Sequence, residues 1–421
     1  MTETQVHISL GGETIRVGTL FRQAARGRQS VTFQYHDTWL QHSARFSLEP
    51  SLAVGGGMFH PGEGREMFGS IGDSAPDTWG RRLMQRAERR AARAEGRPPQ
   101  TLHEADFLLG VSDVSRLGAL RFRRADDDDF QKPVGEGVPG FIQLRRLLES
   151  AQRIERDEET DDDLTLIFAP GSSLGGARPK ASIVDAHGAL AIAKFPKETD
   201  DYSIETWEHI ALILAKRAGI RVPRHELQRI GGRSVLISWR FDREGEIRTP
   251  FLSAMSMLQA KDGERASYPE IVDELARHGA NAKNDAAELF RRVVFSILIS
   301  NVDDHLRNHG FLWAGKSGWC LSPAYDLNPT PTDLKARFLT TNISLDESTC
   351  SIELALSQAE LFGLGANDAK AIISEAGAAV AQWRHVASQV GQTQNQIDRM
   401  ASAFEHEDLV MAARKSTHTK R

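Results

Sequence analysis

An apolar segment that ends in a dense polar cluster constrains the fold of this chain most strongly. Residues 290–301, FRRVVFSILISN, read as an apolar helix, and the polar stretch VDDHLRNHG follows directly at 302–310. A buried helix fixes the start of the stretch that follows it, so we expect the polar side chains to lie on a loop of defined position. Functional loops are commonly mounted on a rigid scaffold in this way.

The composition agrees with a globular chain. With 421 residues, of which 40% are hydrophobic, the sequence is long enough for two or three packed cores. The 52 basic and 57 acidic residues nearly balance, which argues against attraction of the whole protein to nucleic acid or membrane. Cys320 and Cys350 are too few for a disulfide scaffold, so we expect buried thiols in a reducing compartment. No leader pattern or apolar run of about 18 residues occurs, which predicts a cytoplasmic protein without a membrane partner.

The order of the expected helices and strands indicates that the chain contains more than one domain. Residues 5–21 read as two strands around a Gly-Gly turn, and 73–95 read as a helix with Asp77 at its N-cap. An acidic and Pro/Gly-rich break at 125–140 marks a first boundary. Residues 164–195 then read as strand, glycine loop, strand, turn and strand, and the pattern beyond 250 is mostly helical.

The polar cluster has the spacing of a phosphoryl-transfer loop. Asp303 precedes Asn308 by five positions, as the catalytic aspartate of protein kinases precedes an asparagine. Asp326 follows a short apolar strand in the segment CLSPAYDLNP. Carboxylate and amide oxygens suit Mg²⁺, so Asn308 and Asp326 are candidate metal ligands. Asp303 is the candidate that orients an acceptor hydroxyl.

Two other interpretations of the cluster compete with this one. His305 and His309 lie four residues apart, as zinc ligands on a helix do, but no Glu follows His305 and a loop is expected here. Alternatively, the Asp and Asn side chains only cap neighbouring backbone groups. The loop alone does not decide between capping and catalysis, so the kinase interpretation depends on the other half of a nucleotide site.

That other half is found upstream. Residues 171–180, GSSLGGARPK, form a glycine and serine loop that can bring backbone N–H groups close to phosphate oxygens, although it matches neither a P-loop nor a Rossmann motif. Lys194 ends an apolar strand, where its ammonium could meet the α- and β-phosphates. Glu208 on the next helix is placed to pair with Lys194, and Glu205 is its competitor one turn away. The glycine loop, the strand lysine, the helix glutamate, the Asp303 loop and Asp326 follow one another along the chain in the same order as the corresponding features of protein kinases.

These segments resemble the HipA family, bacterial serine/threonine kinases that act as toxins of toxin–antitoxin modules. SSLGGARPKA is similar to the family's phosphate loop, AIAKF to its ATP-binding strand, NVDDHLRNHGFL to its catalytic loop and SPAYDLNP to its metal-binding segment. The resemblance covers nearly the whole chain. It implies an α+β, two-lobed protein-kinase-like fold, with an accessory subdomain at 1–130, a β-rich N-lobe at 140–248 and a mostly helical C-lobe at 249–421.

The resemblance also implies roles for single residues. Asp303 matches the catalytic aspartate, and Asn308 and Asp326 match the ligands of Mg²⁺. The residues implied in ATP binding are Ser173, Gly175, Gly176, Ala177, Lys180, Lys194, Glu208, His305, Asn308 and Asp326.

Several of these assignments have alternatives. Ser173 aligns best with a serine that some members autophosphorylate, and Ser172 beside it is the alternative. Lys180 aligns with a loop lysine of the motif, although a surface lysine is the plain interpretation. Asp304 stands where some relatives carry glycine, so the assignment of Asp303 depends on spacing. His305 is expected to orient the loop through hydrogen bonds.

The implied function is that of an ATP- and Mg²⁺-dependent protein serine/threonine kinase and toxin. It would phosphorylate itself and a cellular, translation-related protein, with a link to bacterial persistence. The implied partners are a helix-turn-helix antitoxin of the HipB type and, through it, operator DNA. The alternative is a catalytically weak co-repressor that binds an antitoxin on operator DNA. Lys194, Asp303, Asn308 and Asp326 favour the kinase, because a scaffold has no chemical need for all four.

Overall fold

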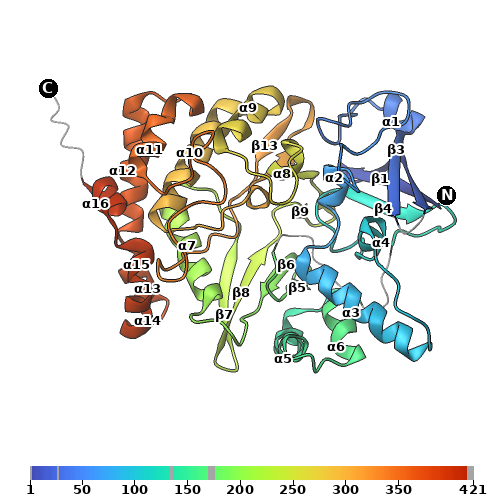
Figure 1. Ribbon diagram of the computed structural model, residues 1–421, viewed down its shortest axis with the longest axis horizontal. Coiled ribbons are helices and arrows are strands. Elements are labelled where there is room, and N and C mark those ends of the chain that lie inside the picture. The colour runs from blue at the N-terminus through green and yellow to red at the C-terminus, as the bar shows by residue number, and fades with distance from the viewer. Residues whose placement is uncertain (1, 26–27, 132–136, 169–175, 415–421) are drawn as a thin grey trace. The chain divides into compact units, whose positions relative to one another are not determined.

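The structure is a computed structural model that describes residues 2–25, 28–131, 137–168 and 176–414 (Figure 1). Its chain divides into two compact units. Unit 1 comprises Met1–Asp200 and Gln228–Lys261, and unit 2 comprises Asp201–Leu227 and Asp262–Arg421. The division into a subdomain and two lobes stays a prediction. None of the helices within the described ranges is both long and apolar enough to cross a membrane.

Unit 1 begins with an antiparallel sheet of strand order β3-β2-β1-β4. The expected N-terminal hairpin is confirmed, because β1 and β2 pair around Gly11 and Gly12, both of which have positive φ. Alternate side chains such as Val6 and Ile8 are fully buried on one face. The strands are β1 (Thr2–Leu10), β2 (Glu13–Ala25), β3 (Arg28–Tyr35) and β4 (Leu120–Arg124).

A second antiparallel sheet, of order β5-β6-β8-β7, carries the strand lysines. Its strands are β5 (Lys180–Val184), β6 (Leu190–Lys194), β7 (His225–Ile230) and β8 (Arg233–Trp239). Strands β5 and β6 lie where two strands around a turn were expected within 164–195. The remaining elements of unit 1 are α1 (Asp37–Gln41), α2 (Gly69–Gly72), α3 (Thr78–Ala94), α4 (Glu104–Leu109), η1 (Phe141–Gln143), α5 (Leu144–Glu155), α6 (Asp161–Phe168), β9 (Arg243–Glu244), β10 (Ile247–Arg248), β11 (Phe251–Ser253) and α8 (Ala254–Met257).

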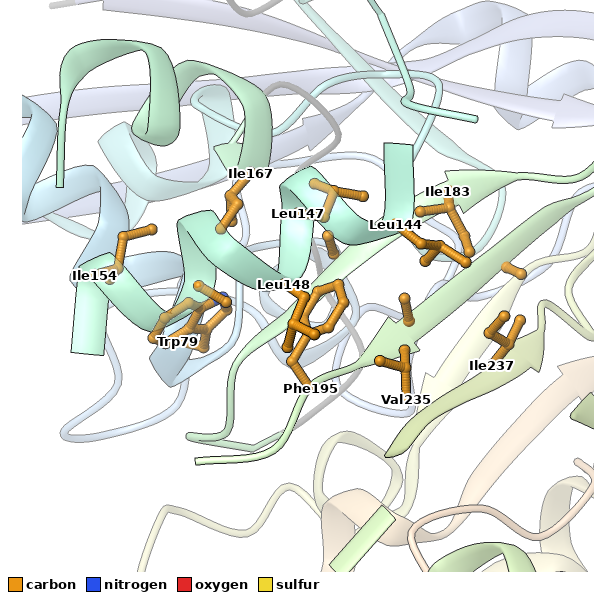
Figure 2. Packing of buried hydrophobic residues seen from close by; sticks show 14 of the residues in the cluster. Trp79, Leu144, Leu147, Leu148, Ile154, Ile167, Ile183, Phe195, Val235 and Ile237 are labelled. Atoms are coloured by element: carbon orange, nitrogen blue, oxygen red, sulfur yellow. The ribbon is translucent and has the colours of Figure 1, made fainter. Parts of the chain in front are cut away.

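One apolar core joins this second sheet to three helices. Figure 2 shows Leu144 and Leu148 of α5 beside strand residues such as Val235, with Trp79 of α3 in the same cluster. Burying one side chain of this size stabilises the fold by about 1.5–3 kcal/mol. Helix α3, which falls within the expected 1–130 subdomain, therefore shares its core with elements of the expected N-lobe.

Residues 161–168 form helix α6, so the strand predicted over LTLIF was wrong. Three aspartates occupy the first turn, where negative charge interacts favourably with the helix dipole. Thr160 N donates to Asp163 Oδ2 at 2.9 Å and Asp163 N to Thr160 Oγ1 at 3.2 Å, which is the reciprocal bonding of a capping box. Leu164 and Ile167, three residues apart, are then buried on one face. The apolar run was too short for its period to separate helix from strand.

Unit 2 is mostly helical, as expected beyond residue 250, and is built around a buried helix, α10. Helix α10 packs on α9 and α12, and α7 packs on α12 and α13, where Trp207 lies against Trp383 and Phe404. The elements are α7 (Ile204–Arg217), α9 (Tyr268–His278), α10 (Ala282–Leu298), η2 (Leu306–Asn308), β12 (Gly310–Trp313), η3 (Gly315–Ser317), β13 (Trp319–Leu321), α11 (Ile352–Ser357), η4 (Ala359–Phe362), α12 (Ala366–Val380), α13 (Trp383–Gln389), α14 (Gln394–Arg399), α15 (Ala401–Phe404) and α16 (Glu407–Ala413).

Candidate active site

The polar cluster lies on a loop that leaves the buried end of α10. Helix α10 ends at Leu298, and Ser300 then adopts a left-handed backbone with φ of 52°. The two adjacent carboxylates point to different environments: the side chain of Asp303 is 65% exposed, whereas that of Asp304 is 3% exposed. The loop therefore presents one carboxylate to solvent and keeps the other inside unit 2.

Asp304 is held by hydrogen bonds within unit 2. Its Oδ2 accepts from Tyr268 Oη at 2.6 Å and from Ser296 Oγ at 3.1 Å, and its Oδ1 lies 3.1 Å from His309 Nε2. Burial alone would raise the pKa of Asp304, but its interaction with His309 and the hydrogen bonds from Tyr268 and Ser296 outweigh burial and leave the pKa below its usual range. The hydrogen bonds inside unit 2 thus explain why an aspartate stands at position 304. Of the two neighbouring carboxylates, only that of Asp303 is accessible to a hydroxyl group from solvent.

The loop's own backbone and Asn308 fix Asp303. The Asp303 carbonyl accepts from His305 N at 2.9 Å and from Asn308 Nδ2 at 3.2 Å. The His305 carbonyl in turn accepts from Asn308 N at 2.8 Å. The backbone of His305 takes part in these bonds, whereas its ring Nδ1 has no hydrogen-bond partner among the described residues, and an orienting role for the ring stays a prediction.

Asn308 and Asp326, the two candidate metal ligands, lie on segments that hydrogen bonds tie together. Tyr325 Oη donates to the carbonyl of Arg307 at 2.6 Å, which joins the residues immediately before Asp326 and Asn308. On the other side of Asp326, Asn328 N donates to Asn301 Oδ1 at 3.0 Å. The segment that carries Asp326 is therefore fastened to the loop that carries Asn308 at two points.

The donor set fits a hard divalent cation. Asn308 is buried, and its amide Oδ1 has no hydrogen-bond partner in the described part of the chain. A buried oxygen without a donor is costly unless a ligand satisfies it, and Mg²⁺ accepts such an amide oxygen. Asp326 has a φ of 60°, and Asn328 Nδ2 donates to its Oδ1 at 3.0 Å. Non-glycine residues in this conformation are uncommon and are enriched at functional sites.

The expected phosphate loop is only partly described. Ser172, Ser173 and Gly175 lie outside the described residues. Gly176 has a φ of 108°, which favours glycine, and a Cβ there would lie 3.2 Å from Lys180 Nζ and crowd that side chain. Ala177 follows in the half-buried stretch before β5.

Lys180 is buried, so its interpretation as a surface lysine was wrong, and it forms an ion pair that we did not predict from the sequence. Its Nζ lies 2.7 Å from Asp77 Oδ2, and both side chains are almost completely buried. Asp77 uses its other oxygen as the N-cap of α3, accepting from Gly80 N at 2.8 Å, which confirms the expected cap. Trp79 adds two bonds, from its backbone N to Gly176 O and from its indole to Lys180 O. The start of α3 thus fixes the end of the glycine loop.

Lys194 and the two glutamates are placed by regular elements. Lys194 ends β6, with Lys180 and Leu236 as its neighbours across the sheet. Glu205 and Glu208 both lie on α7 and are both buried. Lys194 belongs to unit 1 and the glutamates to unit 2, so the pairing of Lys194 with either glutamate stays a prediction.

Replacing Asp304 by alanine should destabilise unit 2. The change leaves the buried Tyr268 hydroxyl without its acceptor, and we expect a cost of about 3 kcal/mol. For a unit of this size that corresponds to a fall of roughly 6–12 °C in the melting temperature, measured by circular dichroism. Asp303→Ala is the matched control, because loss of an exposed carboxylate should change stability by less than about 0.5 kcal/mol. Equal melting temperatures for the two variants would show that the Asp304 network carries no stability.

Comparisons with known proteins show which families of chains resemble this one. The family model described as the HipA-like C-terminal domain matches residues 172–383, slightly more than half of the chain. A Haemophilus influenzae protein, provisionally named a kinase, is 27% identical over 180 residues, which cover 37% of this chain and 52% of that protein. The Sinorhizobium fredii protein Y4dM, also provisionally named a kinase, is 31% identical over 205 residues, covering 45% of this chain and 47% of that protein. The chain thus spans about half the length of these two relatives.

A solved structure extends the similarity in fold to almost the whole chain. It is the complex of HipA, HipB and operator DNA from the toxin antitoxin system of Shewanella oneidensis MR-1. The match has a TM-score of 0.67 at 18% identity and covers 97% of this chain and 96% of that chain. The α+β, kinase-like fold expected from the sequence is therefore confirmed. On the extent of the family match, the chain belongs to the family of proteins with a HipA-like C-terminal domain.

Proposed function

We propose that this protein is a Mg²⁺-dependent kinase that transfers the γ-phosphoryl group of ATP to a serine or threonine hydroxyl of a protein. The observation that carries the proposal is the exposed Asp303 carboxylate beside Asn308, whose buried Oδ1 has no partner among the described residues. Relatives provisionally named kinases support the same chemistry.

The proposed roles follow from the positions of the side chains. Bound Mg²⁺ would neutralise phosphate charge and bridge the nucleotide to the protein. Asn308 Oδ1 and the Asp326 carboxylate would hold the ion, and Lys194 would pair with the phosphates from the end of β6. Asp303 would accept a hydrogen bond from the acceptor hydroxyl and orient it toward the phosphorus. Most of the rate enhancement in such a site comes from positioning and electrostatics.

The partners and the biological role belong to the same proposal. Because the matched HipA structure contains HipB and operator DNA, we propose a helix-turn-helix antitoxin and operator DNA as partners, in the cytoplasm. The protein would act as a toxin on a translation-related protein, with a role in persistence. Autophosphorylation at Ser173, or at Ser172, stays a prediction because both residues lie outside the described ranges. A catalytically weak co-repressor remains the alternative.

Incubation with ATP labelled at its γ-phosphate tests the proposal. The purified chain and a cell extract are incubated with labelled ATP and Mg²⁺, with and without excess chelator. We expect acid-stable label on serine or threonine of a protein in the Mg²⁺ sample and none in the chelated sample. Absence of label from all proteins, while the chain still binds an antitoxin, would contradict the kinase and support the co-repressor.

A further inference from the structure

A segment beyond Asp326 holds the backbone on both sides of Asp303. The carbonyl of Val302 accepts from Thr340 N at 3.1 Å and from Thr340 Oγ1 at 3.0 Å. The carbonyl of Asp304 accepts from Thr341 Oγ1 at 2.7 Å and from Thr341 N at 3.2 Å. The carbonyl groups of the residues immediately before and after Asp303 are therefore held by two consecutive threonines.

The same segment is anchored to the helices behind the loop. Arg337 donates to the carbonyl of Ile297 at 2.9 Å and to Ser300 Oγ at 3.1 Å, and its guanidinium lies 2.7 Å from Asp408. The adjoining turn is closed by bonds from Leu334 N and Lys335 N to the Pro331 carbonyl, at 3.0 and 3.3 Å. A turn built in this way holds the backbone of Lys335 in a fixed place near Asp303 and leaves the side chain free to rotate.

Lys335 is the residue that this turn brings to the catalytic carboxylate. Its Nζ lies 3.5 Å from Asp303 Oδ1, and the two side chains are 58% and 65% exposed. In the part of the chain that the structure describes, Lys335 is the one cation that pairs with Asp303. An exposed ion pair of this kind contributes only about 0–1 kcal/mol to the free energy of unfolding. Stabilisation of the fold therefore does not explain why Lys335 lies beside Asp303.

A cation at this position suits phosphoryl transfer. Charge develops on the transferred group while it lies between the acceptor and leaving oxygens, and a nearby positive side chain stabilises that charge. The acceptor hydroxyl must lie against Asp303 for transfer. The Lys335 ammonium already reaches the Asp303 carboxylate, so rotation about the side-chain bonds of Lys335 would bring it to the oxygens of a phosphoryl group bound there.

We infer that Lys335 is a catalytic residue that contacts the transferred phosphoryl group, an inference that rests on the proposed kinase function. The acceptor oxygen forms its bond to the γ-phosphorus while the bond from that phosphorus to the β,γ-bridging oxygen breaks. The bridging oxygen keeps the electron pair and leaves as part of ADP, and the acceptor's proton passes to the Asp303 carboxylate. Lys335 keeps its proton throughout, and its ammonium turns from Asp303 Oδ1 to the phosphoryl oxygens.

Steady-state kinetics of Lys335→Ala and Lys335→Arg test this role. The phosphate acceptor in this assay is the protein that the wild-type enzyme phosphorylates. If the enzyme phosphorylates only itself, autophosphorylation is measured. We expect Lys335→Ala to lower kcat about 10- to 100-fold while KM for ATP changes by less than about threefold, because the contact is made mainly in the transition state. Lys335→Arg keeps the charge and should recover most of the lost rate. The matched control is Lys316→Ala, which removes an exposed lysine of η3 and should leave the rate unchanged.

The outcomes separate this inference from the proposed function. If the wild type transfers phosphate and Lys335→Ala has a kcat within about twofold of it, or a higher one, the role of Lys335 is wrong and the kinase stands. Failure of Lys335→Arg to recover any rate would also overturn the role of the charge. If the wild type itself transfers no phosphate, the proposed function is wrong and the inference falls with it. Melting temperatures should agree among all variants, since Lys335 is exposed.

Discussion

Replacing Asp303 by asparagine is expected to lower the rate of phosphoryl transfer roughly 10²- to 10⁴-fold, the range that a positioned general base contributes. The amide keeps the size of the side chain but cannot take the acceptor's proton. Affinity for ATP should stay the same, because Asp303 is not among the proposed metal ligands. The rate is measured by single-turnover transfer of labelled phosphate, and ATP affinity by equilibrium binding.

The control for Asp303→Asn is Asp346→Asn, which neutralises another exposed aspartate of unit 2. Its transfer rate should equal that of the wild type. Because the Asp303 side chain is 65% exposed, its replacement should also leave the melting temperature unchanged. Transfer retained within about tenfold of the wild type would remove Asp303 from the catalytic role.

Replacing Asp326 by asparagine should weaken Mg²⁺-dependent nucleotide binding at least about tenfold, or by about 1.4 kcal/mol. The reason is the loss of a charged oxygen ligand from the site formed with Asn308. Asparagine is the suitable substitution because Asp326 has a φ of 60°, which asparagine tolerates and alanine does not. The measurement is a titration of a fluorescent ATP analogue at fixed protein and increasing Mg²⁺.

Asp333→Asn is the matched control, because Asp333 is exposed and pairs with Arg399 at 2.9 Å rather than with a proposed ligand. Its Mg²⁺ titration should overlay that of the wild type. In chelator, the wild type and Asp326→Asn should bind the analogue equally weakly. A Mg²⁺ dependence unchanged by Asp326→Asn would exclude this carboxylate as a metal ligand and leave Asn308 without its partner.

The sequence predicted which segments carry the candidate site, but not which of two adjacent carboxylates is accessible. Asp303 and Asp304 differ by one position, and spacing to Asn308 alone separates them. The burial of Asp304 depends on Tyr268 and Ser296, which lie 36 and 8 residues before it and donate hydrogen bonds to its carboxylate. Such partners are set by the tertiary fold and leave no local pattern.

Lys180 and Lys335 show two further limits of prediction from the sequence. Lys180 stood in a motif and suggested a phosphate contact, whereas the structure pairs it with Asp77, 103 residues earlier. A signal was present, because an N-cap aspartate uses one oxygen and leaves the other for a cation. Lys335 stands in no motif, and it is brought to Asp303 by tertiary contacts of its segment: the turn closed on Pro331, the bonds of Arg337 and those of Thr340 and Thr341.

The fold was most predictable where the pattern was long. The N-terminal hairpin and the helix from Thr78 to Ala94 follow clear turn and capping residues. The error at α6 arose in LTLIF, a segment of four apolar residues and one threonine that follows an acidic run, because strand and helix periods cannot be told apart over five residues.

The buried pair of Lys180 and Asp77, with Trp79 beside it, bears on how proteins of this architecture can evolve. Helix α3 supplies both the counter-charge and a large aromatic side chain to the core beneath the second sheet. A recombination event that replaced the first 130 residues would bury an ammonium without its carboxylate, unless the incoming segment carried both groups. We therefore expect the N-terminal segment to be inherited together with the second sheet, and residues 77, 79 and 180 to change together or not at all.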